Sequence, residues 1–216
     1  MREEEHAGRI VGARLYTTGR MLTPAKGYQC CSGALQVTDY DSTLPALDAM
    51  LARQPDMIKI TREGRGMSVR SEDLALIPLD VMTRLVEHIH EAGLRVSVHI
   101  SDEKSARESI AAGVDALAHP VYLEEASPAF AKLVAAKGLP VSTTLGRLDT
   151  DLSVFDRPIF VATLNDEDRA ENKSNPMYRS DSARGGFRAS LKDFATKNLR
   201  ALFDTVIERW RLSGNT

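Results

Sequence analysis

Two short apolar segments that each end near a histidine constrain the fold of this chain more than any other feature. Residues 95–100 read Arg-Val-Ser-Val-His-Ile, and residues 116–119 read Ala-Leu-Ala-His. The polar stretch between them, 102–113, ends in glycine and has the length of a helix. A helix of that length spans roughly 18 Å, close to the roughly 17 Å of a five-residue strand. The helix can therefore return the chain to the start of the next strand, which predicts parallel strands joined by a helix.

Alternation along the predicted strands places the candidate functional side chains on one face. In residues 95–100 the aliphatic side chains share one face, and Ser97 and His99 share the other. An upstream strand at 57–61 repeats the pattern, with Lys59 opposite two isoleucines. Because the carboxyl ends of parallel strands meet at one edge of a sheet, we expect Lys59, His99 and His119 to gather there.

Turn and capping residues divide the rest of the chain. Pro78 and Gly93 bound one predicted helix, Ser127 and Gly138 bound another, and the alternation of strands and helices stops after Gly146. We expect strands at 12–18, 57–61, 95–100, 115–119 and 140–145, helices at 42–54 (capped by Ser42), 78–92, 102–112, 127–138 and 191–212, and a loop at 22–27. A long excursion at 165–188 is expected to be disordered, a plain surface loop or a substrate lid, with the lid the least favoured of the three.

Composition narrows the class of protein. With 216 residues and 43% hydrophobic content, the chain can bury one core, so we predict a single domain over 1–216. A net charge of −2 argues against a nucleic-acid partner. No apolar run reaches the length of a membrane span, and the first residues do not resemble a signal peptide, so the expected location is the cytoplasm. The adjacent Cys30 and Cys31 suit neither a disulfide nor a CxxC metal motif.

A second pair of histidines lies within the predicted helix 78–92. His88 and His90 are two positions apart, which separates them by about 200° around a helix axis. They cannot converge on one metal, so we interpret them as ordinary helix residues.

Five segments, taken in order, resemble the metal-dependent amidohydrolase superfamily, particularly its imidazolonepropionase-like and prolidase-like branch. The resemblance covers nearly the whole chain and implies an α/β fold, a partial TIM-type (β/α) barrel with parallel strands and outer helices. The segments are Gly12–Thr23, Asp56–Ile60, Val96–His99, Ile110–Asp115 and Leu117–His119.

The resemblance also implies a site and a chemistry. In binuclear members the lysine that Lys59 resembles is carboxylated and bridges two metals, while His99 and His119 resemble histidines that each bind metal. The implied cofactor is a divalent metal, zinc in one or two copies, and imidazole nitrogen is a good zinc ligand. The implied reaction is hydrolysis of a C–N amide or related bond in a small-molecule substrate.

The chain departs from the family pattern in ways that matter for activity. Its 216 residues contain neither the His-x-His pair of the first barrel strand nor the aspartate after the last, and Ala118 and Pro120 replace a common glutamate and glycine. We therefore expect a domain incomplete at both ends, with weak metal binding and absent or very slow hydrolysis. Its open sheet edge predicts modest self-association.

Two other functions remain open. The alternative reading is a non-catalytic amidohydrolase-like remnant that acts as an interaction or binding module. A phosphate-binding α/β protein is less favoured, because no glycine-rich loop joins a strand to a helix in the required form.

Overall fold

The structure is a computed structural model that describes residues 2–65, 74–148, 152–175 and 183–212. The described residues form two compact units. Unit 1 contains 2–65, 74–100 and 104–117, and unit 2 contains 101–103 and the described residues from 118 onward. The single domain over 1–216 stays a prediction.

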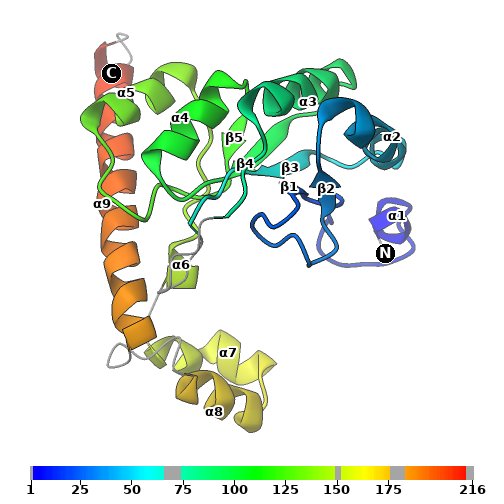
Figure 1. Ribbon diagram of the computed structural model, residues 1–216. Coiled ribbons are helices and arrows are strands. Elements are labelled where there is room, and N and C mark those ends of the chain that lie inside the picture. Colours follow the sequence, from blue (N-terminus) through cyan, green and yellow to red (C-terminus); the bar gives the residue numbers. More distant parts are fainter. Residues whose placement is uncertain (1, 66–73, 149–151, 176–182, 213–216) are drawn as a thin grey trace. The chain divides into compact units, whose positions relative to one another are not determined.

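Unit 1 is built on a parallel sheet (Figure 1). The described strands are β1 (Leu22–Pro24), β2 (Leu35–Val37), β3 (Ile58–Thr61), β4 (Val96–His99) and β5 (Ala116–Leu117). They form one five-stranded sheet in the order β2-β1-β3-β4-β5, and each neighbouring pair is parallel. The predicted α/β class with parallel strands is confirmed. Association through an outer strand stays a prediction.

The register between β3 and β4 fixes which side chains share a face. Lys59 pairs with Ser97, and Thr61 pairs with His99. Directly paired residues point to the same face of a sheet, and alternate residues along a strand do so as well. These four polar residues therefore share one face, as alternation along the two strands predicts. The four aliphatic residues on the other face, Ile58, Ile60, Val96 and Val98, are fully buried.

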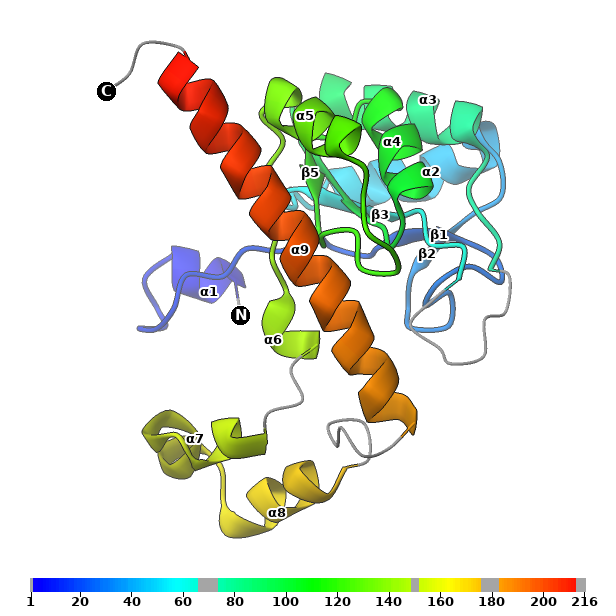
Figure 2. The ribbon, with the colours of Figure 1, turned by 90° about the vertical axis from the view of Figure 1, so that its left-hand side faces the viewer.

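Helices cover the sheet of unit 1. They are α2 (Tyr40–Leu51), α3 (Leu79–Glu91) and α4 (Glu103–Ala111, of which Glu103 belongs to unit 2). Figures 1 and 2 show all three on the same side of the sheet. Helix α3 has the clearest amphipathic pattern, because Val81, Met82, Leu85, Val86 and Ile89 are all buried.

The start of α2 differs from the prediction. Asp39 caps this helix, and its carboxylate accepts a hydrogen bond of 2.9 Å from the Ser42 backbone N–H. Hydrogen bonds from the Ser42 backbone and hydroxyl lower the pKa of Asp39. Ser42, the predicted cap, instead lies within the first turn of the helix, because Asp39 offers two acceptor oxygens one turn earlier.

Unit 2 is helical in its described residues. Its helices are α5 (Pro128–Lys137), α6 (Leu145–Leu148), the 3₁₀ helix η1 (Leu152–Asp156), α7 (Pro158–Thr163), α8 (Asp166–Ser174) and α9 (Ala183–Leu212). Helix α9 runs beside α5 (Figure 2). A core cluster joins Tyr122, Leu148, Leu191 and Ala195. Among the described residues, no helix is both long enough and apolar enough to cross a membrane.

Three of the predicted segments, a strand at 12–18, a loop at 22–27 and a strand at 140–145, are wrong. Residues 12–18 form no strand. The Asp56 backbone N–H donates to the Thr17 carbonyl, and the Thr17 backbone N–H donates to the Asp56 carboxylate, so both backbone groups of Thr17 are used outside a strand pairing. Residues 22–27 contain β1, which tolerates Pro24 because its pairing with β3 ends at Leu22. The predicted strand 140–145 is only a single bridge residue at Val141 followed by α6.

The predicted excursion 165–188 is largely helical where the structure describes it. The side chain of Asn165 caps α8 by accepting a hydrogen bond of 2.7 Å from the Asp168 backbone N–H. Helix α9 begins at Ala183, earlier than the predicted start at 191. The part of the excursion at 176–182 lies outside the described residues.

The end of α5 offers a test of the local backbone. Gly138 follows the helix with φ of 62°, a left-handed conformation, and an added Cβ would meet no atom within 4 Å. We expect Gly138→Ala to lower the free energy of unfolding by roughly 1 kcal/mol through backbone strain alone. Gly12→Ala is the matched control, because that glycine also faces open space but has no positive φ. Thermal unfolding followed by circular dichroism measures the difference, and equal stabilities would contradict the expectation.

Candidate functional site

The candidate site of unit 1 lies at the carboxyl ends of β3 and β4. Thr61 and His99 are the last residues of their strands and are paired in register, and Lys59 stands two positions earlier on the same face. Parallel α/β folds carry their chemistry at this edge of the sheet. Two of the three predicted site residues are therefore on one face of adjacent strands.

His99 is held in a buried and specific environment. The side chain is 4% exposed, and its Nε2 atom lies 3.3 Å from Oε2 of Glu63, whose side chain is fully buried. The ring of Tyr28 stacks on the imidazole, with centroids 4.2 Å apart and planes 10° apart. The ring face and the ring nitrogen are thus fixed by two different residues.

Glu63 is the functional candidate that sequence reasoning missed. Its Oε1 atom accepts a hydrogen bond of 3.0 Å from the Arg65 backbone N–H, which orients the carboxylate. The residue lies in a segment predicted as a polar loop. One signal could have found it, because positions 59, 61 and 63 continue the two-residue alternation of β3 beyond the end of the strand.

Buried hydroxyl groups connect this edge to β1. The Thr61 hydroxyl donates to Thr23 Oγ1 at 2.9 Å, and the Thr23 hydroxyl donates to the Tyr28 carbonyl at 2.9 Å. Gly27 makes the tight approach possible, since a Cβ there would lie 2.6 to 2.8 Å from side-chain atoms of Pro24 and Thr23. This chain of bonds anchors the backbone that carries the stacked tyrosine.

Lys59 is half-buried at the same edge. Burial lowers the pKa of its ammonium group. The lowered pKa favours the neutral amine, which is the nucleophilic form of a lysine.

His119 belongs to unit 2 and follows β5 by two residues. Its Nδ1 atom shares a hydrogen bond of 3.0 Å with Oγ1 of Thr144, and its ring packs edge-on against Tyr122. Thr144 has φ of 43°, an unfavourable conformation for a β-branched residue. A bond that orients one imidazole nitrogen is typical of metal-binding histidines, so the local geometry suits a ligand. The assignment of Lys59, His99 and His119 to one metal site stays a prediction.

Few of the described side chains are placed together to hold a metal. Within the described ranges, no group of three or more His, Cys, Asp or Glu side chains is arranged to hold a metal ion. The imidazole of His99 and the carboxylate of Glu63 are nonetheless both ligand types that zinc accepts.

The helix histidines have separate roles, as predicted. His88 Nε2 lies 2.7 Å from a carboxylate oxygen of Asp48, and His90 Nε2 lies 2.8 Å from a carboxylate oxygen of Asp115. Their partners differ, which confirms that the pair does not converge. The two cysteines are free thiols with sulfur atoms 3.3 Å apart.

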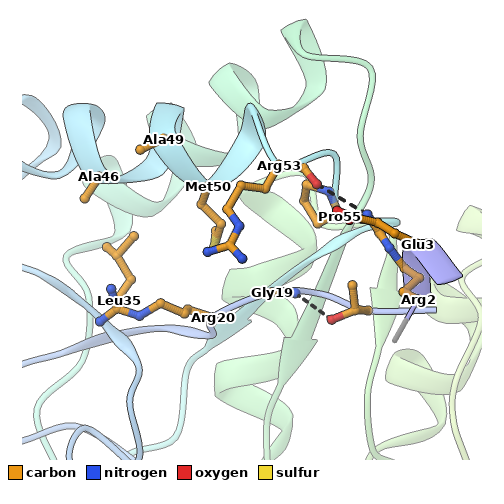
Figure 3. Close-up of a pocket in the computed structure, with 11 residues that line it drawn as sticks. Arg2, Glu3, Gly19, Arg20, Leu35, Ala46, Ala49, Met50, Arg53 and Pro55 are labelled. Carbon is orange, nitrogen blue, oxygen red and sulfur yellow. Dashed lines mark hydrogen bonds between the residues drawn. The ribbon is translucent and has the colours of Figure 1, made fainter. Parts of the chain in front are cut away.

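Unit 1 also has a cavity of about 720 Å³ at the opposite edge of the sheet (Figure 3). Its lining includes Arg20, which precedes β1, Leu35 at the start of β2, and Pro55, which precedes β3. These residues mark the amino ends of the strands. None of the predicted site residues lines this cavity.

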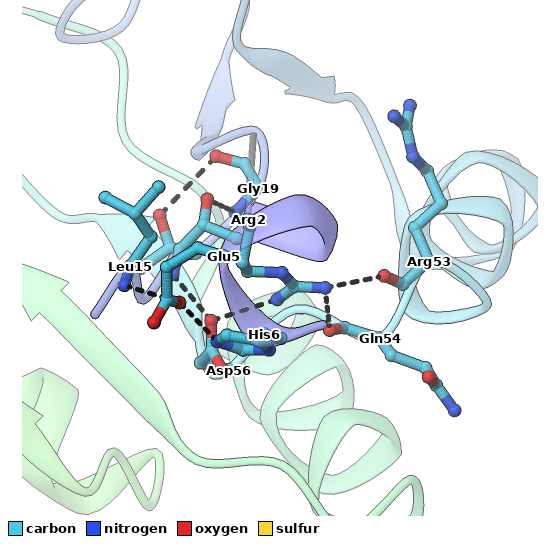
Figure 4. Close-up of polar contacts among 10 residues, drawn as sticks. Arg2, Glu5, His6, Leu15, Gly19, Arg53, Gln54 and Asp56 are labelled. Carbon is cyan, nitrogen blue, oxygen red and sulfur yellow. Dashed lines mark hydrogen bonds and ion pairs between the residues drawn. The ribbon is translucent and has the colours of Figure 1, made fainter. Parts of the chain in front are cut away.

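Polar contacts join some of the residues that line this cavity to Asp56 and Gln54 (Figure 4). The Arg2 guanidinium donates to the Asp56 carboxylate at 3.0 Å and to the carbonyls of Arg53 and Gln54 at 3.3 and 2.8 Å. The same carboxylate accepts the Thr17 backbone N–H at 2.6 Å. Hydrogen bonds from Thr17 and Arg2 lower the pKa of Asp56. This cluster attaches helix α1 (Arg2–His6) to the sheet, a structural role.

Comparison with known proteins identifies the fold. No family model and no curated protein matches the sequence. Solved structures do match, each over 94% of this chain. An amidohydrolase matches at 18% identity with a TM-score of 0.66 over 49% of its own length, and a Xaa-Pro dipeptidase with bound methionine matches at 15% identity with a TM-score of 0.66 over 48% of its length. The ochratoxinase of A. niger matches at 19% identity with a TM-score of 0.65 over 46% of its length. The chain spans about half the length of the solved structures that it matches.

These matches define the class by its architecture. The chain has an α/β fold that corresponds to about half of an amidohydrolase-type barrel chain, which confirms at the level of fold the resemblance stated from sequence. At these identities the similarity shows the fold alone.

Proposed function

We propose that this chain is part of a metal-dependent hydrolase of the amidohydrolase type, which cleaves a C–N amide or related bond in a small molecule. The observation that carries the proposal is the register between β3 and β4. It brings Lys59 and His99 to one face of two adjacent parallel strands, at the edge where barrel enzymes have their active sites. The match to amidohydrolase structures supports the same assignment.

Each proposed site residue has a role that suits its surroundings. His99 and His119 bind metal through imidazole nitrogens, and zinc is the proposed ion. When bound, zinc lowers the pKa of a coordinated water and polarises the scissile carbonyl. His99 is pre-oriented by the Tyr28 ring, and His119 by the Thr144 hydroxyl.

Lys59 is proposed to act as a carbamate. Its neutral amine attacks carbon dioxide, a new N–C bond forms, and the nitrogen releases one proton. The product is an anion that can bridge two cations. The lowered pKa of Lys59 increases the fraction of neutral amine that is available for this step.

A dipeptide is the first substrate class to test, because one matching structure is a Xaa-Pro dipeptidase and a peptide bond is a C–N amide bond. The predicted activity of the 216-residue chain is absent or very slow, so metal binding is the more informative measurement.

Removing the imidazole of His99 is expected to weaken zinc binding by at least about tenfold. Loss of a residue that only hydrogen-bonds to a zinc ligand already costs about that much, and His99 is proposed to be a ligand itself. Calorimetric titration of the metal-free 216-residue chain with zinc measures the affinities of wild type and His99→Ala. His88→Ala is the matched control, because that histidine pairs with Asp48 on a helix and is expected to leave zinc affinity unchanged.

The accompanying assay follows release of proline from Xaa-Pro dipeptides with and without zinc. Equal zinc affinities in wild type and His99→Ala would contradict the proposed site. Robust zinc-dependent release of proline would overturn both the expected inactivity of this chain and the non-catalytic alternative.

A further inference from the structure

We propose that Glu63 is a metal-binding residue and that it shares one divalent ion with His99. The inference rests on the metal site of the proposed function and extends it to a residue that neither the sequence resemblance nor the comparisons assign. All the residues that carry it lie in unit 1.

The first argument is the distance between the two donor atoms. Nε2 of His99 and Oε2 of Glu63 are 3.3 Å apart. Zinc binds histidine nitrogen and carboxylate oxygen at about 2.1 Å in tetrahedral geometry, so two donors to one ion are about 3.4 Å apart. The two atoms already have the separation that a shared ion requires.

The second argument is the cost of burying a carboxylate. The Glu63 side chain is fully buried, and an ionised carboxylate is stable in such a position only with strong compensation. A divalent cation bound by Oε2 and Nε2 would offset the negative charge of this carboxylate at the buried site.

The third argument is the rigidity of the pair. The Arg65 backbone N–H fixes one carboxylate oxygen at 3.0 Å, and the stacked Tyr28 ring fixes the plane of the imidazole. Donors that are already in place lose little conformational freedom when an ion binds.

The face of the sheet offers one further donor. Lys59 precedes Thr61 by two positions and shares the face of His99. A carbamate on Lys59 would add a second anionic group to the Glu63 carboxylate. A histidine, a glutamate and a lysine carbamate together make a mixed nitrogen and oxygen site of the kind that zinc and cobalt(II) accept.

The test replaces the carboxylate by an amide of the same shape. Glu63→Gln keeps an oxygen that can accept the Arg65 N–H but loses the negative charge. We expect it to weaken zinc binding by about 10- to 100-fold in calorimetry, the range seen when support of a zinc site is lost. We also expect the visible absorption of bound cobalt(II) to change, which a purely structural role of Glu63 would not cause. Glu91→Gln, at an exposed position of α3, is the matched control.

The outcomes separate this inference from the function that it extends. Unchanged affinity and cobalt spectrum in Glu63→Gln, with loss of binding in His99→Ala, would overturn the role of Glu63 and leave the proposed function standing. Wild-type binding in both variants would overturn both. Should Glu63→Gln fail to fold, Glu63→Asp retains the carboxylate, and we then expect a weaker but measurable cobalt complex with a shifted spectrum. An unshifted spectrum in Glu63→Asp would overturn the inference.

Discussion

Replacing Glu108 by leucine is expected to lower the free energy of unfolding by about 3–5 kcal/mol, the usual cost of leaving a buried charge without its partner. Arg62, at the end of β3, is buried, and its guanidinium contacts the Glu108 carboxylate at 2.6 and 2.8 Å. Its remaining nitrogen donates to the Ile77 carbonyl at 2.8 Å. Without Glu108, the buried guanidinium keeps its bond to the neutral Ile77 carbonyl and loses its charged partner. Urea denaturation followed by circular dichroism measures the loss.

The double variant separates the buried charge from lost packing. Arg62→Met combined with Glu108→Leu removes both charges, and we expect it to be more stable than Glu108→Leu alone. Glu87→Leu is the control for the substitution itself, since Glu87 is exposed on α3, and it is expected to change stability by less than about 0.5 kcal/mol. A double variant less stable than Glu108→Leu would show that the ion pair is not the source of the effect.

Elements with strong local signals were predicted well from the sequence. Helix α5 begins at the Ser127 cap and ends at Gly138 as predicted, because hydroxyl caps and left-handed glycines act within one turn. Strand β4 and helix α3 were also found, since each has a clear period and a definite stop. Local chemistry alone determines these boundaries.

The short strands at the start of the sheet could not be found in this way. Strands β1 and β2 have three residues each, too few for alternation to be recognised. Their pairing depends on contacts with distant segments, such as the bond from the Thr61 hydroxyl to Thr23. Pro24 and Gly27 favoured a loop by composition, although Gly27 in fact permits the close approach of Thr23 and Pro24.

The sequence predicted only part of the candidate site, because only the residues on strands follow a periodic pattern. Alternation along β3 and β4 predicted that Lys59 and His99 share one face, and the register between the two strands confirms this placement. The stacked Tyr28 comes from a loop, where no periodic pattern marks a functional residue, and the buried Glu63 lies beyond the end of β3 in a segment predicted as a polar loop. Both were therefore missed, although Tyr28 stacks on the His99 ring and Glu63 pairs with its Nε2 atom.

The largest expected effect in unit 2 comes from a single amide on α9. Replacing Asn198 by leucine is expected to lower the free energy of unfolding by about 3 kcal/mol, because unsatisfied buried polar groups cost roughly 1–3 kcal/mol each. The Asn198 side-chain N–H groups donate to the carbonyls of Val121 and Glu124, both at 2.9 Å, and its oxygen accepts the Ala126 backbone N–H at 2.8 Å. The side chain is 4% exposed, so water cannot easily replace these bonds.

Leucine has the branching of asparagine and a larger volume, so the loss of stability does not arise from a cavity. Asn172→Leu on α8 is the control, because that amide makes one bond of 2.8 Å to the Asp168 carbonyl at an exposed position. We expect this control to change stability by less than about 0.5 kcal/mol. Urea denaturation of both variants measures the difference. Since Asn198 contacts three backbone groups within the segment 121–126, its loss should also speed amide hydrogen exchange there. Unchanged exchange at Ala126 in Asn198→Leu would show that α9 does not hold this segment in place.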